Sequence, residues 1–189
     1  MRIISGIAGG RKLAAPPGEK TRPTSDKLRG SLFNILRLRT QEAWVLDVFG
    51  GTGALALEAM SRGAARAVII EKDRAAWDVI QKNAQSVLGA DFSERVDIIR
   101  GDYRAVLSRL EAAKYDMIFL DPPYRMLEAY GAALNLLRER GLLAEDAVVI
   151  CERARGAQAE YPAEFEIYDT RLYGETAVDF LRERRILTE

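Results

Sequence analysis

Histidine is absent from the 189 residues of this chain, and cysteine occurs once, as Cys151. The lack of histidine excludes imidazole acid–base chemistry, Ser-His-Asp triads and most zinc sites. A single cysteine excludes an internal disulfide framework and indicates a cytoplasmic protein. Catalysis, if the chain is an enzyme, has to depend on carboxylates, lysine, tyrosine, backbone groups or a cofactor.

Long apolar runs are also missing, and none approaches the length of about 20 residues that a membrane-spanning helix needs. No secretory signal is recognisable. With 48% hydrophobic and 30% charged residues, the composition is that of an ordinary soluble globular protein. The length suits one domain with a core of its own. We therefore expect a soluble protein without a membrane partner.

The chain has no net charge, but its charges are unevenly distributed. Residues 1–40 contain nine Lys or Arg and two acidic residues, a balance of +7. The remainder contains 19 basic and 26 acidic residues, a balance of −7. A basic segment on an acidic body is the pattern expected for binding to a polyanion. An unevenly charged solvated surface is the alternative.

The first 40 residues are expected to form an extension ahead of the main domain. Short apolar runs on either side of the Gly9-Gly10 pair indicate a β-hairpin. After a loop, a helix is expected from residue 24 or 25 to about residue 37. Gly30 lies inside this helix and should cost up to about 1 kcal/mol relative to alanine.

Strands and helices alternate after residue 40, which predicts a parallel sheet with helices on both faces. Strands are expected near 44–49, 66–71, 95–99, 115–120 and 146–152, and helices near 53–62, 74–88, 103–112 and 126–140. Two β-rich runs at 164–172 and 176–185 are joined by Tyr-Gly-Glu and indicate a hairpin. The last strand should therefore enter the sheet antiparallel to its neighbour.

A glycine-rich turn joins the first of these strands to a helix. The run Gly50-Gly51-Thr52-Gly53 follows an apolar strand and precedes Ala-Leu-Ala-Leu-Glu. Such a turn lets the backbone approach a ligand at the N-terminus of a helix. Glycines 51 and 53, with Ala56, also fit the fingerprint of dinucleotide-binding proteins, so a nicotinamide cofactor is an alternative.

Acidic residues stand at the ends of the predicted strands. Glu71 ends the second strand, about 20 residues past the glycines, where an acid accepts hydrogen bonds from ribose hydroxyls. Lys72 beside it fits a helix-entry turn. Asp102 follows the third strand, where it can meet the amino group of an adenine or cap the next helix. Asp47, before the glycines, is expected to face a ligand or support the residues that do.

The run Asp121-Pro122-Pro123-Tyr124 follows the apolar strand 115–120. Consecutive prolines remove two N–H donors, so the Asp121 carboxylate and the Pro122 carbonyl are available as acceptors. Tyr124 adds a flat ring. Two acceptors and a stacking plane suit an exocyclic NH2 group on a planar base, although a simple strand-ending turn has the same composition.

Together these motifs resemble those of class I methyltransferases that use S-adenosylmethionine. Asp-Val-Phe-Gly-Gly-Thr-Gly at 47–53 is similar to their first motif, and Asp-Pro-Pro-Tyr at 121–124 to the fourth motif of enzymes that methylate exocyclic amines. The closest match is the RsmD family, which makes N2-methylguanine in bacterial 16S ribosomal RNA. Its more specific signatures are Arg-Ile-Ile-Ser-Gly at 2–6, Gly-Arg-Lys-Leu at 10–13, Arg-Pro-Thr-Ser-Asp at 22–26, Leu-Phe-Asn-Ile-Leu at 32–36 and Tyr-Gly-Glu-Thr at 173–176.

The resemblance implies a Rossmann-like α/β fold with a seven-stranded, mostly parallel sheet, S-adenosylmethionine as cofactor and no metal. It also implies a monomer that acts on 16S ribosomal RNA in the 30S subunit or a late assembly intermediate. The implied catalytic residues are Asp121, Pro122, Pro123 and Tyr124. Implied cofactor-binding residues are Asp47, Phe49, Gly50, Gly51, Thr52, Gly53, Glu71, Lys72, Asp102 and Tyr103. Candidate RNA contacts in the basic segment are Arg11, Lys12, Arg22, Thr24, Lys27 and Arg29.

The sequence departs from the family pattern at Gly30, where a glutamate is expected. Two other functions fit the same motifs. A methyltransferase acting on adenine N6, cytosine N4 or a glutamine amide needs the same pair of acceptors. A non-catalytic RNA-binding module on this fold is the second alternative, against which the intact glycines argue.

Overall fold

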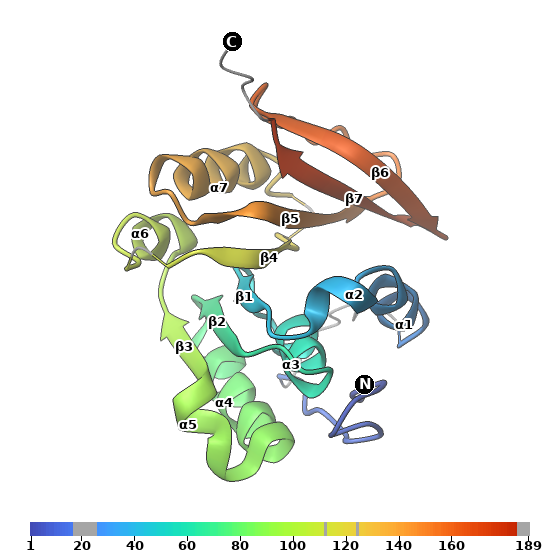
Figure 1. Cartoon of the computed structure of the whole chain (residues 1–189), viewed down its shortest axis with the longest axis vertical. Coiled ribbons are helices and arrows are strands. Elements are labelled where there is room, and N and C mark those ends of the chain that lie inside the picture. Colours follow the sequence, from blue (N-terminus) through green and yellow to red (C-terminus); the bar gives the residue numbers. More distant parts are fainter. Residues whose placement is uncertain (17–25, 112, 124, 185–189) are drawn as a thin grey trace.

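The computed structural model describes residues 1–16, 26–111, 113–123 and 125–184. Its centre is a seven-stranded sheet with the strand order β3-β2-β1-β4-β5-β7-β6 (Figure 1). The strands are β1 (Trp44–Asp47), β2 (Arg66–Glu71), β3 (Val96–Arg100), β4 (Tyr115–Leu120), β5 (Leu143–Ala154), β6 (Phe165–Tyr173) and β7 (Thr176–Glu183). The helices are α1 (Asp26–Ile35), α2 (Arg37–Thr40), α3 (Ala54–Ser61), α4 (Arg74–Leu88), α5 (Phe92–Arg95), α6 (Tyr103–Leu107) and α7 (Glu128–Glu139), with a 3-10 turn η1 (Gly89–Asp91).

Strands β1 to β5 are parallel, and β7 runs antiparallel to both β5 and β6. This arrangement confirms the predicted fold class, including the antiparallel last strand. Strand β4 is buried along almost its whole length, as expected for a parallel strand that is covered on both faces.

Two apolar layers cover the two faces of the sheet. One contains the buried side chains of α1, α3 and α4 together with residues 1–16, and the other contains those of α6 and α7. Figure 1 shows α6 and α7 on one side of the sheet and α1 to α3 on the other. Because helices cover both faces, the free ends of the parallel strands are left as the place for a site.

The element boundaries differ from the predicted ones in a few places. Helix α6 ends at Leu107 instead of 112, and the chain goes on in a tighter turn in which Arg109 N–H donates to the Val106 carbonyl three residues back. Helix α7 starts at Glu128, after a turn in which Met126 N–H donates to the Pro123 carbonyl. The short elements between 89 and 95 were not predicted.

Residues 1–16 form a hairpin-like turn held by one antiparallel bridge, between Arg2 and Lys12, rather than by two regular strands. This turn packs into the main core, where Ile3 and Leu13 are buried in the same apolar layer as the sheet. The predicted boundary near residue 40 stays a prediction. The basic segment and the sheet nevertheless share one core.

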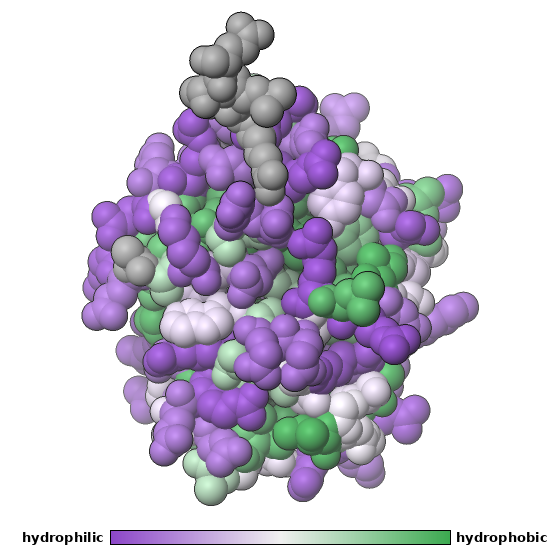
Figure 2. Space-filling view, viewed as in Figure 1, coloured by the Kyte–Doolittle hydropathy of each residue, from purple (hydrophilic) through white to green (hydrophobic). Residues whose placement is uncertain are grey.

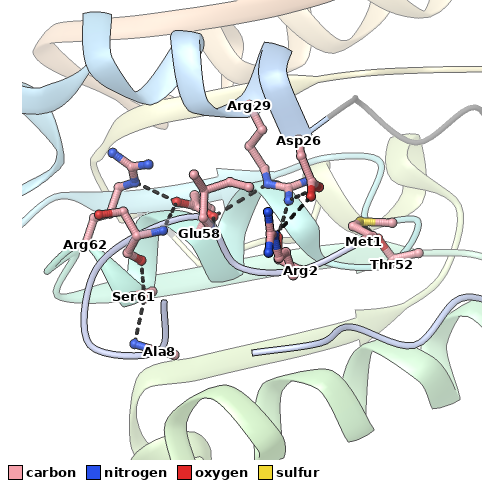
Figure 3. A network of polar contacts seen from close by, with 11 residues as sticks. Met1, Arg2, Ala8, Asp26, Arg29, Thr52, Glu58, Ser61 and Arg62 are labelled. Carbon is pink, nitrogen blue, oxygen red and sulfur yellow. Dashed lines mark hydrogen bonds and ion pairs between the residues drawn. The ribbon is translucent and has the colours of Figure 1, made fainter. Parts of the chain in front are cut away.

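Glu58 of α3 anchors this segment (Figure 3). Its fully buried carboxylate accepts hydrogen bonds from the backbone N–H of Ile4 at 2.7 Å and of Ser5 at 3.1 Å. The same carboxylate pairs with Arg62 at 2.7 Å and lies 3.5 Å from Nε of Arg29. Because Arg29 also pairs with Asp26 at 3.0 Å, two guanidinium groups and two carboxylates balance in charge, and the buried carboxylate of Glu58 is paired.

The surface seen in Figure 2 is largely hydrophilic, and its hydrophobic residues lie in small separate patches. Within the described residues, no helix combines the length and the apolar character needed to cross a membrane.

Candidate active site

A cavity of about 450 Å³ opens at the carboxyl ends of the central strands. The strand order reverses between β1 and β4, and ligands of open α/β sheets bind at such a switch point. The volume lies in the range of small-molecule sites. The cavity is lined by Met1, Asp47, Val48, Phe49, Gly50, Gly51, Thr52, Ala54, Leu55, Ile70, Glu71, Lys72, Asp73, Ala76, Gly101, Asp102, Tyr103, Asp121, Pro122, Pro123, Met126 and Glu152.

The glycine turn forms one wall of this cavity. A side chain at Gly50 would come within 2.5 Å of Ile69 Cγ2, so the turn can pack on the sheet only without one. Gly51 and Gly53 have φ angles of +55° and +76°, which glycine adopts without strain. A Cβ at Gly51 would meet nothing within 4 Å, so the backbone of the turn is open toward a ligand. Gly53 itself does not line the cavity but shapes the turn that starts α3.

Glu71 ties the glycine turn to the end of β2. One carboxylate oxygen accepts from Gly51 N–H at 2.8 Å, and the other accepts from Asp73 N–H at 2.8 Å. A carboxylate has about four acceptor positions, so both oxygens retain capacity for a ligand. The predicted ribose acid is therefore fixed in place by two backbone donors. Lys72 also lines the cavity and is exposed.

Asp47 lies at the base of the cavity with a side chain that is only 1% exposed. Burial raises the pKa of its carboxyl to about 7, against the opposing effect of hydrogen bonds from the backbone of Phe49 and Ala56. Its Oδ1 atom is buried and has no hydrogen-bond partner among the described residues. A buried acceptor without a partner is costly and indicates that a donor from a ligand completes the site.

An aromatic pair closes the cavity on the side of β3. The rings of Phe49 and Tyr103 lie 4.9 Å apart at a tilt of 51°. The Tyr103 hydroxyl is buried and also lacks a partner within the described part of the chain. Asp102 caps α6 by accepting from Arg104 N–H at 2.9 Å, and its exposed carboxylate also lines the cavity. The two roles predicted for Asp102 as alternatives are therefore compatible.

Asp121 and Pro122 lie opposite the glycine turn. The Asp121 carboxylate is half-buried, and the structure describes no residue that hydrogen-bonds to it. Burial, with the nearby carboxylates of Glu152 and Asp47, raises the pKa of Asp121 well above its ordinary value. Pro123 uses its carbonyl in the turn to Met126. Tyr124, the predicted stacking residue, lies outside the described residues.

Among the residues that the sequence did not single out, Met1 and Glu152 stand out. Met1 reaches the cavity from the N-terminal turn, and its sulfur lies 3.5 Å from the Thr52 hydroxyl. Glu152 lies in β5, one residue past the end of its pairing with β4, and ends the strand that the sequence predicted at 146–152. A strand-ending acid was the signal used for Glu71, and the same signal would have found Glu152.

The predicted RNA contacts have different surroundings. Arg11, Lys12 and Lys27 are exposed. The structure contradicts the prediction for Arg29, because its side chain is 0% exposed and pairs with Asp26 at 3.0 Å and with Glu58. A guanidinium in that position holds the fold together and is not presented to phosphate. Arg22 and Thr24 lie outside the described residues.

Comparison with known proteins gives consistent results. The family model described as conserved hypothetical protein 95 matches residues 1–182. The chain is 34% identical to ribosomal RNA small subunit methyltransferase D of Escherichia coli over 94% of this chain and 87% of that protein. It is 33% identical to the protein of the same name from Haemophilus influenzae over 80% of this chain and 78% of that protein.

Solved structures show the same likeness. The Escherichia coli protein yhhF superposes with a TM-score of 0.80 at 34% identity, covering 97% of each chain. A protein of Thermus thermophilus superposes with a TM-score of 0.77 at 29% identity, covering 95% of this chain and 98% of that one.

Proposed function

Because the chain belongs to the family of ribosomal RNA small subunit methyltransferase D, we propose that it methylates the exocyclic N2 of one guanine in 16S ribosomal RNA. The methyl donor is S-adenosylmethionine. One observation carries the proposal: Asp121 and Pro122, whose carboxylate and carbonyl are acceptors suited to an amino group, line the same cavity as the glycine turn.

The residues present fit this cofactor. The unpartnered Oδ1 of Asp47 suits an ammonium group, and Glu71 suits ribose hydroxyls. Asp102 can accept from the amino group of adenine, next to the Phe49 and Tyr103 rings. When bound, S-adenosylmethionine supplies an activated methyl group and a positive charge that suits a cavity lined by six acidic residues.

Asp121 and Pro122 act by orienting the amine. An amino group conjugated to a purine is a weak nucleophile. If each of its two N–H groups donates to one of these oxygens, its lone pair points away from both, toward the methyl carbon. Bound S-adenosylmethionine would supply the methyl group to that lone pair, while Asp121 and Pro122 hold the nitrogen in position. Correct placement of reacting groups can contribute about 7–11 kcal/mol in the best intramolecular models.

The charge of Asp121 matters as well as its position. An ionised carboxylate stabilises the positive charge that develops on the amine nitrogen and can take its proton afterwards. Because burial raises the pKa of Asp121, the methylation rate should increase with pH as this group ionises.

The basic segment 1–40 is the proposed RNA contact. Arg11, Lys12 and Lys27 are exposed on the segment that also supplies Met1 to the cavity wall. Contacts between such side chains and phosphates make binding weaker as salt increases. The target guanine has to be unpaired or turned out of its helix, because its amino group is otherwise covered. As the family resemblance implies, the proposed substrate is 16S ribosomal RNA in a small subunit or assembly intermediate in the cytoplasm.

The test uses small ribosomal subunits from cells that lack this gene, tritiated S-adenosylmethionine and mass spectrometry of the nucleosides. The wild-type protein should produce N2-methylguanosine at one position. The Asp121→Ala variant should lose at least about 1,000-fold in rate while it still binds the cofactor, because it removes an acceptor and a charge used at the reacting nitrogen. Asp78→Ala, an exposed carboxylate on α4, is the control. Methylation on adenine N6 or cytosine N4, or full activity of Asp121→Ala, would contradict the proposal.

A further inference from the structure

Glu152 lines the cavity, and methyl transfer as described above gives its carboxylate no role. It is the residue after Cys151 on β5, and Cys151 lies opposite Leu120 in the β4–β5 register. Asp121 is the residue after Leu120. Paired positions on adjacent strands are about 5 Å apart. The carboxylates of Asp121 and Glu152 therefore line the cavity from neighbouring strands.

The position of Glu152 is well defined. Its side chain is only 8% exposed, and its backbone pairs with Val178 of β7. On the other face, the Tyr130 hydroxyl of α7 donates to the Glu152 carbonyl. A side chain held by a central strand and a helix can recognise a ligand with more precision than one on a loop.

The chemistry of the base gives Glu152 a role. Guanine presents two kinds of donor side by side on its Watson–Crick edge, the N2 amino group and the N1–H. Adenine and cytosine present an amino group beside a ring nitrogen that only accepts. An ionised carboxylate is an acceptor and cannot donate. With the amino group held by Asp121 and Pro122, the group beside it is a donor in guanine and an acceptor in the other two bases.

We infer that Glu152 accepts the N1–H of the target base and so restricts the enzyme to guanine. The inference deepens the proposed function and rests on it. Asp121 and Pro122 recognise an amino group, which three bases carry, and Glu152 recognises the atom that distinguishes guanine. Adenine or cytosine in the cavity would place a ring lone pair against this carboxylate at the point where guanine places a donor. Sites that hydrogen-bond a substrate N–H or O–H can reject an analogue lacking it by about 10⁴–10⁵-fold.

The test changes the proposed contact from both sides, once in the base and once in the protein. Small subunits are reconstituted with 16S RNA carrying either guanine or 2,6-diaminopurine at the position that mass spectrometry identifies as methylated. Diaminopurine keeps the N2 amino group but has no N1–H. Wild-type enzyme should prefer guanine by about 100-fold or more. In Glu152→Gln the amide can donate to the bare N1, so the preference should fall by at least about tenfold.

The controls separate this inference from the proposed function. Glu152→Gln should bind S-adenosylmethionine as wild type does and melt at a similar temperature, and the exposed Glu128→Gln should keep the wild-type preference. If Glu152→Gln slows both bases equally, the residue is structural and the inference is overturned while N2 methylation stands. If wild-type enzyme leaves guanine N2 unmodified, the inference and the proposed function both fail.

Discussion

Replacing Asp47 by asparagine should stabilise the free protein at neutral and alkaline pH while it abolishes cofactor binding. The side chain is buried, and burial raises the pKa of its carboxyl from 3.8 to about 7. The folded state therefore holds this proton more tightly than the unfolded state. Stability from this group is fully present below about pH 4 and is lost as the pH rises to about 7.

The size of the effect follows from the difference between the two pKa values. Each pKa unit corresponds to about 1.4 kcal/mol, so ionising Asp47 costs the folded protein about 4 kcal/mol by pH 8. Asparagine has nearly the same shape and no charge, so Asp47→Asn avoids this cost. The stability of the variant relative to wild type should therefore increase by about 4 kcal/mol between pH 4 and pH 8.

Urea denaturation of both proteins at pH 4, 6 and 8, without cofactor, measures the difference. Calorimetry with S-adenosylmethionine at pH 8 tests the predicted loss of cofactor binding. The variant should not bind, because it lacks the negative charge that suits an ammonium group. A stability difference that changes by less than about 1 kcal/mol across this pH range would refute the reasoning about burial. Unchanged cofactor affinity in Asp47→Asn would refute the proposal that Asp47 Oδ1 binds the ammonium group of the cofactor.

Two further predictions concern the anchoring of the N-terminal segment. Glu58→Ala removes a carboxylate that pairs with the buried Arg29 and accepts from the Ile4 and Ser5 N–H groups, and it should cost about 3–5 kcal/mol in urea denaturation. The exposed Glu42→Ala should change the stability little. A loss below about 1 kcal/mol for Glu58→Ala would show that the ion pair is dispensable. Gly30→Ala should stabilise the protein by about 0.5–1 kcal/mol, because its Cβ would meet only Ile4 Cγ2 at 3.7 Å inside α1. Gly53→Ala, at a φ of +76°, should instead destabilise it, and a matching gain there would contradict the backbone argument.

The fold and most of the cavity were predictable because their signals are local. An apolar run, a glycine turn and a helix follow one another within 20 residues, and each strand-ending acid adjoins its own strand. The edge at which these acids meet follows from the parallel arrangement alone. That is why Asp47, Glu71, Asp102 and Asp121 all line one cavity.

What the sequence did not reveal depends on partners that are distant in the chain. A count of basic residues treats Arg29 and Lys27 alike, yet only Arg29 is enclosed by an acid from α3. The place of Glu152 beside Asp121 depends on strand register, which periodicity does not give. The packing of residues 1–16 into the main core could not be predicted either, because their apolar positions are few and irregularly spaced.

The contact between Ala14 and Asn83 has a consequence for how the protein is made. The Asn83 side chain accepts from Ala14 N–H at 2.8 Å and donates to the Ala14 and Thr52 carbonyls. Ala14 and Asn83 are 69 positions apart in the sequence. A ribosome produces the chain in order, so residues 1–16 leave it long before helix α4 exists to receive them. Residues 1–16 thus cannot take their final position until α4 has been synthesised, and the part of the cavity wall that Met1 supplies cannot form before then.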